Sequence, residues 1–148
     1  MTREFALPAK QTKPFSARFS VDALELLSTY SEELGQSMSR VAERIISEGV
    51  QMERFPGIVF RPGPTGRRAA LALGPDVWEI VRDLKSAARH GAPDPVATIA
   101  EATGIERASI ELAARYYAAH PTDVDLSISR NEEATEQLRR RLGISIDA

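Results

Sequence analysis

The chain has 148 residues, no cysteine and a net charge of −2 at pH 7. This length allows one ordinary domain or two small ones, and the lack of cysteine excludes disulfides, thiolate catalysis and thiolate metal sites. No apolar run approaches membrane-spanning length and the N-terminus lacks the apolar core of a signal peptide, so we expect a cytoplasmic protein outside the membrane. Residues 1–70 carry 10 Lys and Arg against 8 Asp and Glu, a net charge of +2, whereas residues 71–148 have a net charge of −4. The basic half is therefore the better candidate for binding nucleic acid.

The chain is expected to begin with a flexible arm over residues 1–13, where no periodicity appears. A short strand follows, in which Phe15, Ala17 and Phe19 alternate with polar residues, the period of a half-buried strand. A single strand has no partner for its backbone N–H and C=O groups, and no hairpin signal follows it. We therefore expect two copies to pair their strands antiparallel in a homodimer or a larger assembly.

Two amphipathic helices are predicted next, within a domain over residues 14–54. Ser20 can cap the first helix, and Gly35 suits its left-handed C-terminal position. Ser37 can cap the second helix, which should end near Arg54 because Pro56 and Gly57 break it. The apolar stripes that would form the dimer core are Ala23, Leu27, Tyr30 and Leu34 on the first helix, and Val41, Ile45 and Met52 on the second.

The order strand–helix–helix, with Arg18 on the polar strand face and Gly35-Gln-Ser37 between the helices, resembles the ribbon-helix-helix family of bacterial DNA-binding dimers. The resemblance implies that the outward strand face enters the major groove. That face holds Ser16 and Arg18, with Lys13 at its edge, and Arg18 can read guanine in a bidentate way. The rival interpretation is a plain helical hairpin in which Arg18 is an ordinary exposed residue.

The start of the second helix is the predicted phosphate clamp. Its free backbone N–H groups and its dipole favour an anion, and the ribbon-helix-helix resemblance implies this role for Ser37, Met38, Ser39 and Arg40. The sequence departs from the family at Pro14, which cannot donate a hydrogen bond and shortens the ribbon by one position.

Residues 55–148 are predicted to form a second domain that combines a small β-hairpin with helices. The whole chain is therefore expected to be mainly α, in the α+β class. Apolar runs on either side of residues 62–66 indicate a β-hairpin, and four helices should follow it. The breaks between these helices are set by Gly91 to Pro93, by Gly104 and by Pro121. Thr122 and Asp125 suggest a capping box for the last helix, whose apolar stripe is thin and interrupted by Asn131, so that this helix should need a surface to dock on.

A helix-turn-helix-like spacing lies between Ile99 and Ile110, with Gly104 at the turn. It suggests a possible second DNA contact, made by Arg107 and Ser109 on a helix and by a hairpin wing carrying Arg61, Arg67 and Arg68. The helix after the turn is apolar almost all round, however, and this half is acidic, which repels phosphate. Packing or protein binding is therefore the favoured role of this half.

Three blocks of the second half resemble a winged-helix-like domain-of-unknown-function family found in VapB-type antitoxins. They run from Phe55 to Arg68, from Pro75 to Val81 and from Tyr116 to Pro121. The resemblance implies an operon with a PIN-like ribonuclease toxin that the antitoxin binds and silences. The last helix and the exposed parts of residues 107–117 are the candidate toxin surfaces.

These observations predict a DNA-binding antitoxin that represses its own operon and neutralises a PIN-like toxin. The rivals are a stand-alone transcriptional regulator, whose second domain binds DNA or oligomerises, and an interaction protein whose ribbon only dimerises. No enzyme activity, metal or other cofactor is expected. The two histidines, His90 and His120, lie beside helix-breaking residues, and the sequence has no phosphate loop, nucleophile elbow or acidic metal cluster.

Overall fold

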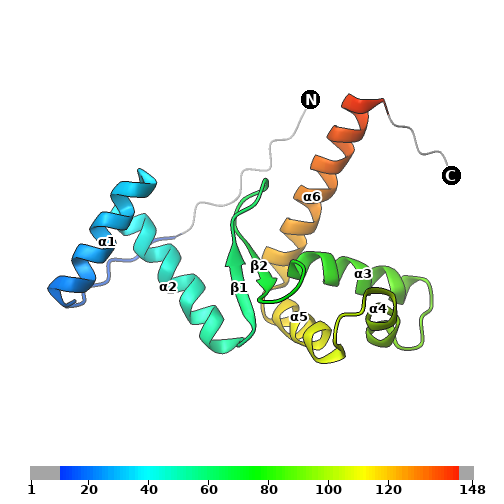
Figure 1. Cartoon of the computed structure of the whole chain (residues 1–148). Helices are drawn as coiled ribbons and strands as arrows, with labels where there is room; N and C mark the ends of the chain where they lie inside the picture. The colour runs from blue at the N-terminus through cyan, green and yellow to red at the C-terminus, as the bar shows by residue number, and fades with distance from the viewer. Residues whose placement is uncertain (1–10, 144–148) are drawn as a thin grey trace. The chain divides into compact units, whose positions relative to one another are not determined.

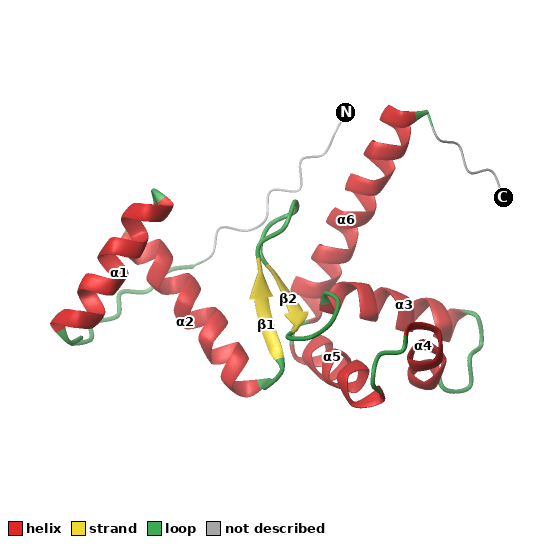
Figure 2. Ribbon diagram, viewed as in Figure 1, coloured by secondary structure: helices red, strands yellow, loops and turns green. Residues whose placement is uncertain are grey.

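The computed structural model describes residues 11–143. Within them the chain is mainly helical, as expected, with one small antiparallel sheet of two strands (Figures 1 and 2). No helix in this range is long and apolar enough to cross a membrane. In chain order the elements are α1 (Val21–Leu34), α2 (Met38–Arg54), β1 (Ile58–Arg61), β2 (Arg68–Leu71), α3 (Val77–Arg89), α4 (Pro95–Thr103), α5 (Arg107–Ala119) and α6 (Pro121–Leu142).

The chain divides into two compact units, and the division falls inside α2, after Glu43. The boundary predicted from the sequence lies eleven residues later, between residues 54 and 55. The difference arises because side chains from the second half of α2 contact the C-terminal elements. Glu48 pairs with Arg67, and Gln51 accepts a hydrogen bond from Tyr116. The last turns of α2 therefore belong with the second unit.

Local capping residues define the helices of the N-terminal unit. The backbone N–H of Ala23 donates to Ser20 Oγ, and Gly35 adopts the left-handed conformation at φ 61°, as predicted. The backbone N–H of Arg40 donates to Ser37 Oγ at the start of α2.

The predicted strand at the start of this unit is absent from the single chain. The described residues 11–20 form neither strand nor helix and are exposed. The physical reason is that a strand is defined by a partner for its backbone N–H and C=O groups, and this chain supplies none there. The ribbon therefore remains a prediction about two copies. The first ten residues of the predicted arm lie outside the described range.

The hairpin of the C-terminal unit pairs Ile58 with Leu71 and Arg61 with Arg68. Gly57 enters it at φ 99°, a conformation that favours glycine. Ala70 also bridges to Asp76, which holds the start of α3 beside β2. The hairpin thereby brings the apolar side chains of Ile58 and Leu71 into the core formed with the helices that follow.

Helices α3 to α5 begin and end close to the predicted residues. Asp76 and Glu79 form a capping box on α3, and Asp94 caps α4 with Pro95 in its first turn. The predicted capping box of the last helix is wrong. Helix α6 starts at Pro121 after His120, and no side chain caps it there. Asp125 instead accepts a hydrogen bond from Lys85, because it already lies on the second turn.

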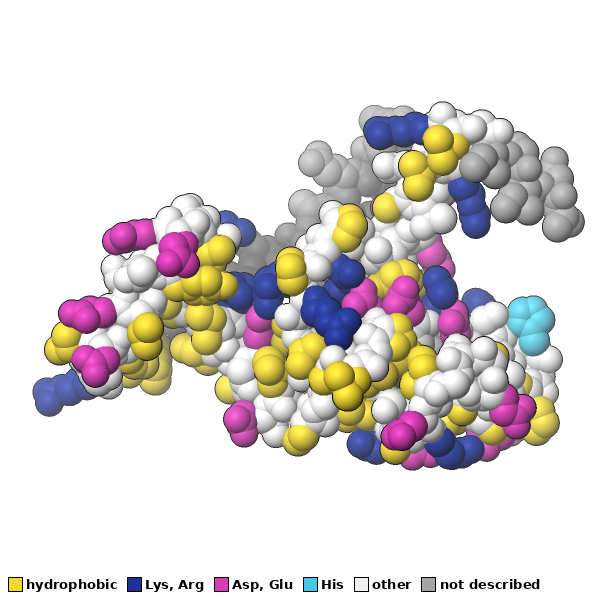
Figure 3. Space-filling view, viewed as in Figure 1, with side chains coloured by type: hydrophobic (Ala, Val, Ile, Leu, Met, Phe, Trp, Pro, Cys, Tyr) yellow, Lys and Arg dark blue, Asp and Glu magenta, His cyan; other side chains and the backbone are white. Residues whose placement is uncertain are grey.

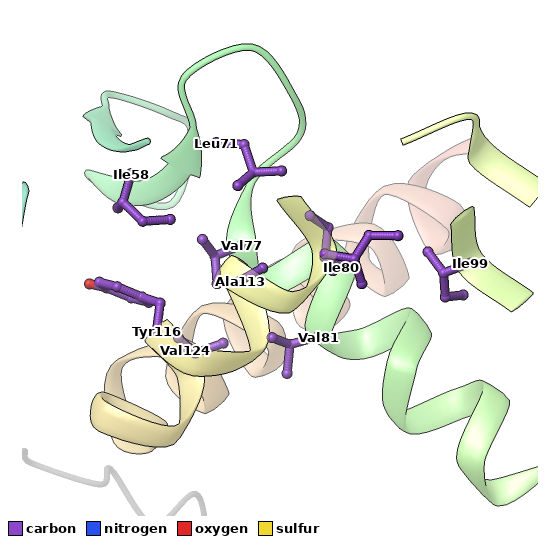
Figure 4. Packing of buried hydrophobic residues seen from close by; sticks show 10 residues of the cluster. Ile58, Leu71, Val77, Ile80, Val81, Ile99, Ala113, Tyr116 and Val124 are labelled. Atoms are coloured by element: carbon purple, nitrogen blue, oxygen red, sulfur yellow. The ribbon is translucent and has the colours of Figure 1, made fainter. Parts of the chain in front are cut away.

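The core of the C-terminal unit lies around α3, which contacts α4, α5, α6 and β2. Figure 4 shows side chains from the hairpin, α3, α5 and α6 converging on one cluster. Its fully buried members include Ile58, Val77, Ile80 and Ile110. The apolar surface of α5, unusually wide for an exposed helix, is explained by this burial, since Ile110, Ala113 and Tyr116 all face the cluster.

Candidate nucleic-acid and partner interfaces

The N-terminal unit exposes much of its apolar surface, as Figure 3 shows over α1 and α2. The exposed fraction is 85% for Phe15, 74% for Leu26 and 58% for Phe19. Phe15 and Phe19 belong to the apolar set of the predicted strand, whereas Leu26 lies outside the stripe predicted for the first helix. The other large exposed apolar side chains of this unit are Val21, Leu24, Tyr30, Leu34 and Met38. Exposed apolar surface on this scale is typical of an interaction site.

The predicted DNA-contacting side chains lie at the surface of the same unit. Lys13, Ser16 and Arg18 are exposed in the segment before α1. Met38, Ser39 and Arg40 are exposed in the first turn of α2. Ser37 accepts the Arg40 N–H through its hydroxyl (3.3 Å) and the Val41 N–H through its carbonyl (3.1 Å), which sets the start of the helix. The helix dipole makes this turn favourable for an anion.

The arginines of the predicted hairpin wing are held by internal contacts. Arg61 donates to the carbonyl oxygens of Leu71 (2.6 Å), Ala72 (3.0 Å) and Gly74 (3.0 Å). The guanidinium therefore closes the loop between β2 and α3. A guanidinium with three carbonyl partners has few donors left for phosphate.

Arg67 and Arg68 are paired with carboxylates. Arg67 makes a bidentate pair with Glu48, at 2.6 and 2.8 Å. Arg68 pairs with Asp76, which also accepts the indole N–H of Trp78. The guanidinium of Arg68 packs against Gly63, where any side chain would overlap it. Trp78 thus anchors the start of α3.

The predicted recognition helix is similarly engaged. Arg107 donates to Asp94 (2.8 Å) and to Glu111 (2.9 Å), so it joins α5 to the cap of α4. The Arg107 guanidinium is the main cause that lowers the pKa of Asp94, and the same contact raises the pKa of Arg107. Ser109 is partly buried on α5. The arginines of the predicted second DNA contact are therefore held by contacts within the chain, Arg61 by carbonyl oxygens and Arg67, Arg68 and Arg107 by carboxylates.

An aromatic cluster and a small cavity were not foreseen from the sequence. Phe55 meets Tyr116 edge-on at 5.2 Å, and His120 lies 4.7 Å from the Tyr116 ring. Beside them a cavity of about 190 Å³ is lined by residues that include Gln51, Trp78 and Tyr116. Phe55 and Tyr116 belong to two of the sequence blocks that resemble the antitoxin-associated family. These two blocks are thus in contact, which their spacing in the sequence does not show.

Helix α6 has two different halves. Val124 is buried, Ile128 packs on the core cluster, and the amide of Asn131 donates to Thr65 in the hairpin turn. Beyond Asn131 the side chains are exposed, with Leu138 at 57% and Leu142 at 61%. Figure 1 shows this half extending away from the other helices of its unit, and Figure 3 shows hydrophobic and basic side chains at its end. We refer to residues 132–142 as the distal half of α6.

Within residues 11–143, no three His, Asp or Glu side chains come together as metal ligands. Comparison of the chain with protein-family models, with curated proteins and with solved structures found no match. The two resemblances therefore stand on the motifs alone.

Proposed function

We propose that this chain is a DNA-binding antitoxin that acts as a homodimer. Two copies pair the segments around residues 14–20 into a ribbon that reads operator DNA, and the C-terminal unit binds a PIN-like ribonuclease toxin. The observation that carries the DNA-binding part is the uncovered apolar surface of the N-terminal unit. Phe15 and Phe19 alternate with the exposed Ser16 and Arg18, so one face of the segment suits a protein core and the other suits a groove.

Pairing with a second copy removes two costs at once. It satisfies the backbone groups of the segment before α1, and it covers the apolar side chains of α1 and α2. Burial of apolar surface contributes about 25 cal/mol per Å², and each large side chain contributes about 1.5–3 kcal/mol when fully buried. Several such side chains per copy provide a strong driving force for dimerisation. A ribbon formed in this way is symmetric and therefore suits a palindromic DNA site.

The DNA contacts of this dimer divide into readers and clamps. Arg18 is the reader, because a guanidinium matches the two acceptors on the major-groove edge of guanine. Ser16 contacts a base edge or a phosphate, and Lys13 neutralises phosphate at the edge of the ribbon. The first turn of α2 holds the backbone phosphates through its N–H groups and dipole. Two copies give few readers, so one dimer should be modestly specific.

The antitoxin part is supported by the distal half of α6. The other candidate, α5, has its apolar side chains turned into the core, which leaves mainly polar groups outside. The distal half of α6 keeps two leucines exposed on a helix that would be marginal alone. A helix that gains stability on docking is a common mode of partner recognition.

The DNA-binding part is tested by replacing Arg18 with Ala and measuring affinity for double-stranded DNA from immediately upstream of the chain's own gene. We expect a loss of about 1–3 kcal/mol per reading contact and a relaxed sequence preference. Arg89→Ala is the matched control, since it removes one exposed arginine from α3 in the other unit. Equal affinity of the Arg18→Ala variant and the wild-type protein would contradict the ribbon. Binding should also weaken with salt, at a slope near −0.9 per phosphate contacted.

The antitoxin part is tested separately by co-expression with the neighbouring open reading frame. A chain ending at Asn131 keeps Val124 and Ile128 in the core but lacks the distal half of α6. It should retain DNA binding and lose co-purification with the neighbouring product. If the full chain binds no neighbouring product but still binds DNA, the chain is a stand-alone regulator.

A further inference from the structure

The stripe that docks the first half of α6 continues past the part that is covered. Val124, Ile128 and Asn131 are spaced by four and three residues, and all three contact the rest of the unit. The same alternation continues through Thr135, Leu138 and Leu142. Alternation of four and three places residues on one seam of a helix, as in coiled coils. The distal half therefore exposes a seam of residues whose spacing suits packing against another helix.

The charges beside this seam indicate which helix it fits. Glu132 directly follows the seam residue Asn131, and Arg139 directly follows the seam residue Leu138. Both therefore flank the same edge of the seam, seven residues apart. A helix lying antiparallel places Glu132 of one copy beside Arg139 of the other, and symmetry repeats the pair. A parallel arrangement places Glu132 and Arg139 against the opposite edge of the partner's seam, where neither meets an opposite charge.

The wider charge distribution of the distal half follows the same order. Its first turns carry Glu132, Glu133 and Glu136, and its last turn carries Arg139, Arg140 and Arg141. An acidic end followed by a basic end is complementary to itself only when two copies run antiparallel. The order also suits the helix alone, because cations are favoured near its C-terminus.

From the exposed seam and its self-complementary flanks, we propose that the distal half of α6 pairs antiparallel with the same segment of a second copy. The two-fold axis passes between Thr135 and Leu138, so that each leucine at position 138 packs over Thr135 of the other copy. This contact goes beyond the proposed function, because in the absence of the toxin it occupies the same surface that the proposed function assigns to toxin binding. A chain with two separate self-pairing surfaces has two possible assemblies. Either both surfaces pair between the same two copies, or each pairs with a different copy and dimers join into larger assemblies.

The pair is short, so it should be weak by itself. Interfaces of stable complexes bury roughly 1,200–2,000 Å² in total, more than two helical segments of about three turns provide. A contact elsewhere that holds two copies together raises the effective concentration of the distal halves and makes a weak pair significant. The fraction of paired α6 helices should therefore rise with protein concentration and with dimerisation of the N-terminal units.

Thiol cross-linking detects the pair whether it forms within a dimer or between dimers. The chain has no cysteine, so Thr135→Cys introduces a single thiol beside the proposed axis without changing the leucines or the flanking charges. A short bismaleimide should link two full-length Thr135→Cys chains efficiently. Ala88→Cys, exposed on α3, is the control for collisions and for proximity caused by the N-terminal unit. Equal linking of the two cysteine variants overturns the proposal.

Charge reversal then tests the orientation. In the Thr135→Cys chain, Glu132→Arg and Arg139→Glu should each reduce linking by roughly ten-fold, because each turns two attractive pairs into repulsive ones. A mixture of the two variants should restore linking between unlike chains, since the arginine at position 132 then meets the glutamate at position 139. Recovery in the mixture also shows that both variants fold. Failure of the mixture to recover, or insensitivity to both reversals, overturns the antiparallel pair.

The same experiment separates this proposal from the alternative occupant. If the purified Thr135→Cys chain links no better than the Ala88→Cys control while the neighbouring gene's product binds the full chain, self-pairing is contradicted and the seam is assigned to that product. Loss of self-pairing leaves the Arg18→Ala measurement unaffected, because the DNA contacts lie in the other unit. Retention of cross-linking in a chain that fails to bind DNA supports the pair and contradicts only the proposed function.

Discussion

The phenol of Tyr116 on α5 donates a hydrogen bond to the side-chain carbonyl of Gln51 on α2, across 2.6 Å. Burial raises the pKa of Tyr116 well above its ordinary value, and the negative charges of Asp123 and Glu48 raise it further. The phenol therefore stays protonated and remains a donor throughout the physiological range. This contact joins the last turns of α2 to the core of the C-terminal unit, which explains why the compact unit begins before the hairpin.

Replacing Tyr116 with Phe should lower the free energy of unfolding of the C-terminal unit by about 1 kcal/mol, since it removes the donor and leaves the ring packed. Urea denaturation followed by the fluorescence of Trp78, the single tryptophan, measures this. Tyr117→Phe is the matched control. Its hydroxyl lies 3.4 Å from Asp125 in a more open position, so the loss should be smaller. Equal losses in the two variants contradict the importance of the Gln51 contact.

Arg61 closes the loop between β2 and α3, and this role leads to a second prediction. Arg61→Lys should destabilise the C-terminal unit by about 1.5–3 kcal/mol, because one ammonium cannot reach the three carbonyls that the guanidinium joins. The same urea titration measures the effect. Arg89→Lys, at the exposed end of α3, should change stability little.

Arg61→Lys also distinguishes a structural arginine from a DNA contact. The charge is retained, so affinity for DNA should stay close to that of the wild-type protein while stability falls. Arg18→Ala should behave in the opposite way, with weaker DNA binding and nearly unchanged stability. A loss of DNA affinity in Arg61→Lys at full stability would restore the hairpin wing as a DNA contact.

The sequence predicted the features that depend on a few neighbouring residues. Ser20 and Gly35 mark the ends of α1, and Gly104 marks the end of α4, because a cap involves groups within about one turn. The hairpin was predicted from its turn residues in the same way. The capping box at Thr122 failed because Pro121 already suits the first turn of a helix, so α6 begins two residues earlier than the cap requires.

The roles of the arginines could not be predicted in this way. Arg67 is 19 residues from Glu48, and Arg107 is 13 residues from Asp94. A long cationic side chain is equally compatible with phosphate and with a carboxylate, and only tertiary packing decides which is near. The segment before α1 shows a second limit of prediction from one sequence. Its apolar–polar alternation predicts a strand, but residues 11–20 form no strand in the single chain, and their pairing with a second copy remains a prediction.

The junction of α4 and α5 leads to a prediction about pH. Asp94 accepts the Arg107 guanidinium on one carboxylate oxygen (2.8 Å) and the Ala97 N–H on the other (3.0 Å). These contacts lower the pKa of Asp94 below 3.8, the value of the unfolded chain. A group whose pKa is lower in the folded state binds fewer protons there, so its stabilising contribution is present above 3.8 and disappears as the pH falls through the folded pKa.

Asp94→Asn should therefore reduce stability near pH 5 and have a smaller effect near pH 3, because that pH lies below 3.8 and part of the stabilising contribution of Asp94 is already lost there. Asparagine caps a helix about as well as aspartate, so the difference isolates the charge. Urea titrations of both proteins at the two pH values measure it. Glu101→Gln, on the exposed surface of α4, controls for the general effect of removing one acidic charge. An Asp94→Asn cost that is unchanged or larger at pH 3 contradicts the ion pair with Arg107 as the source of this stabilisation.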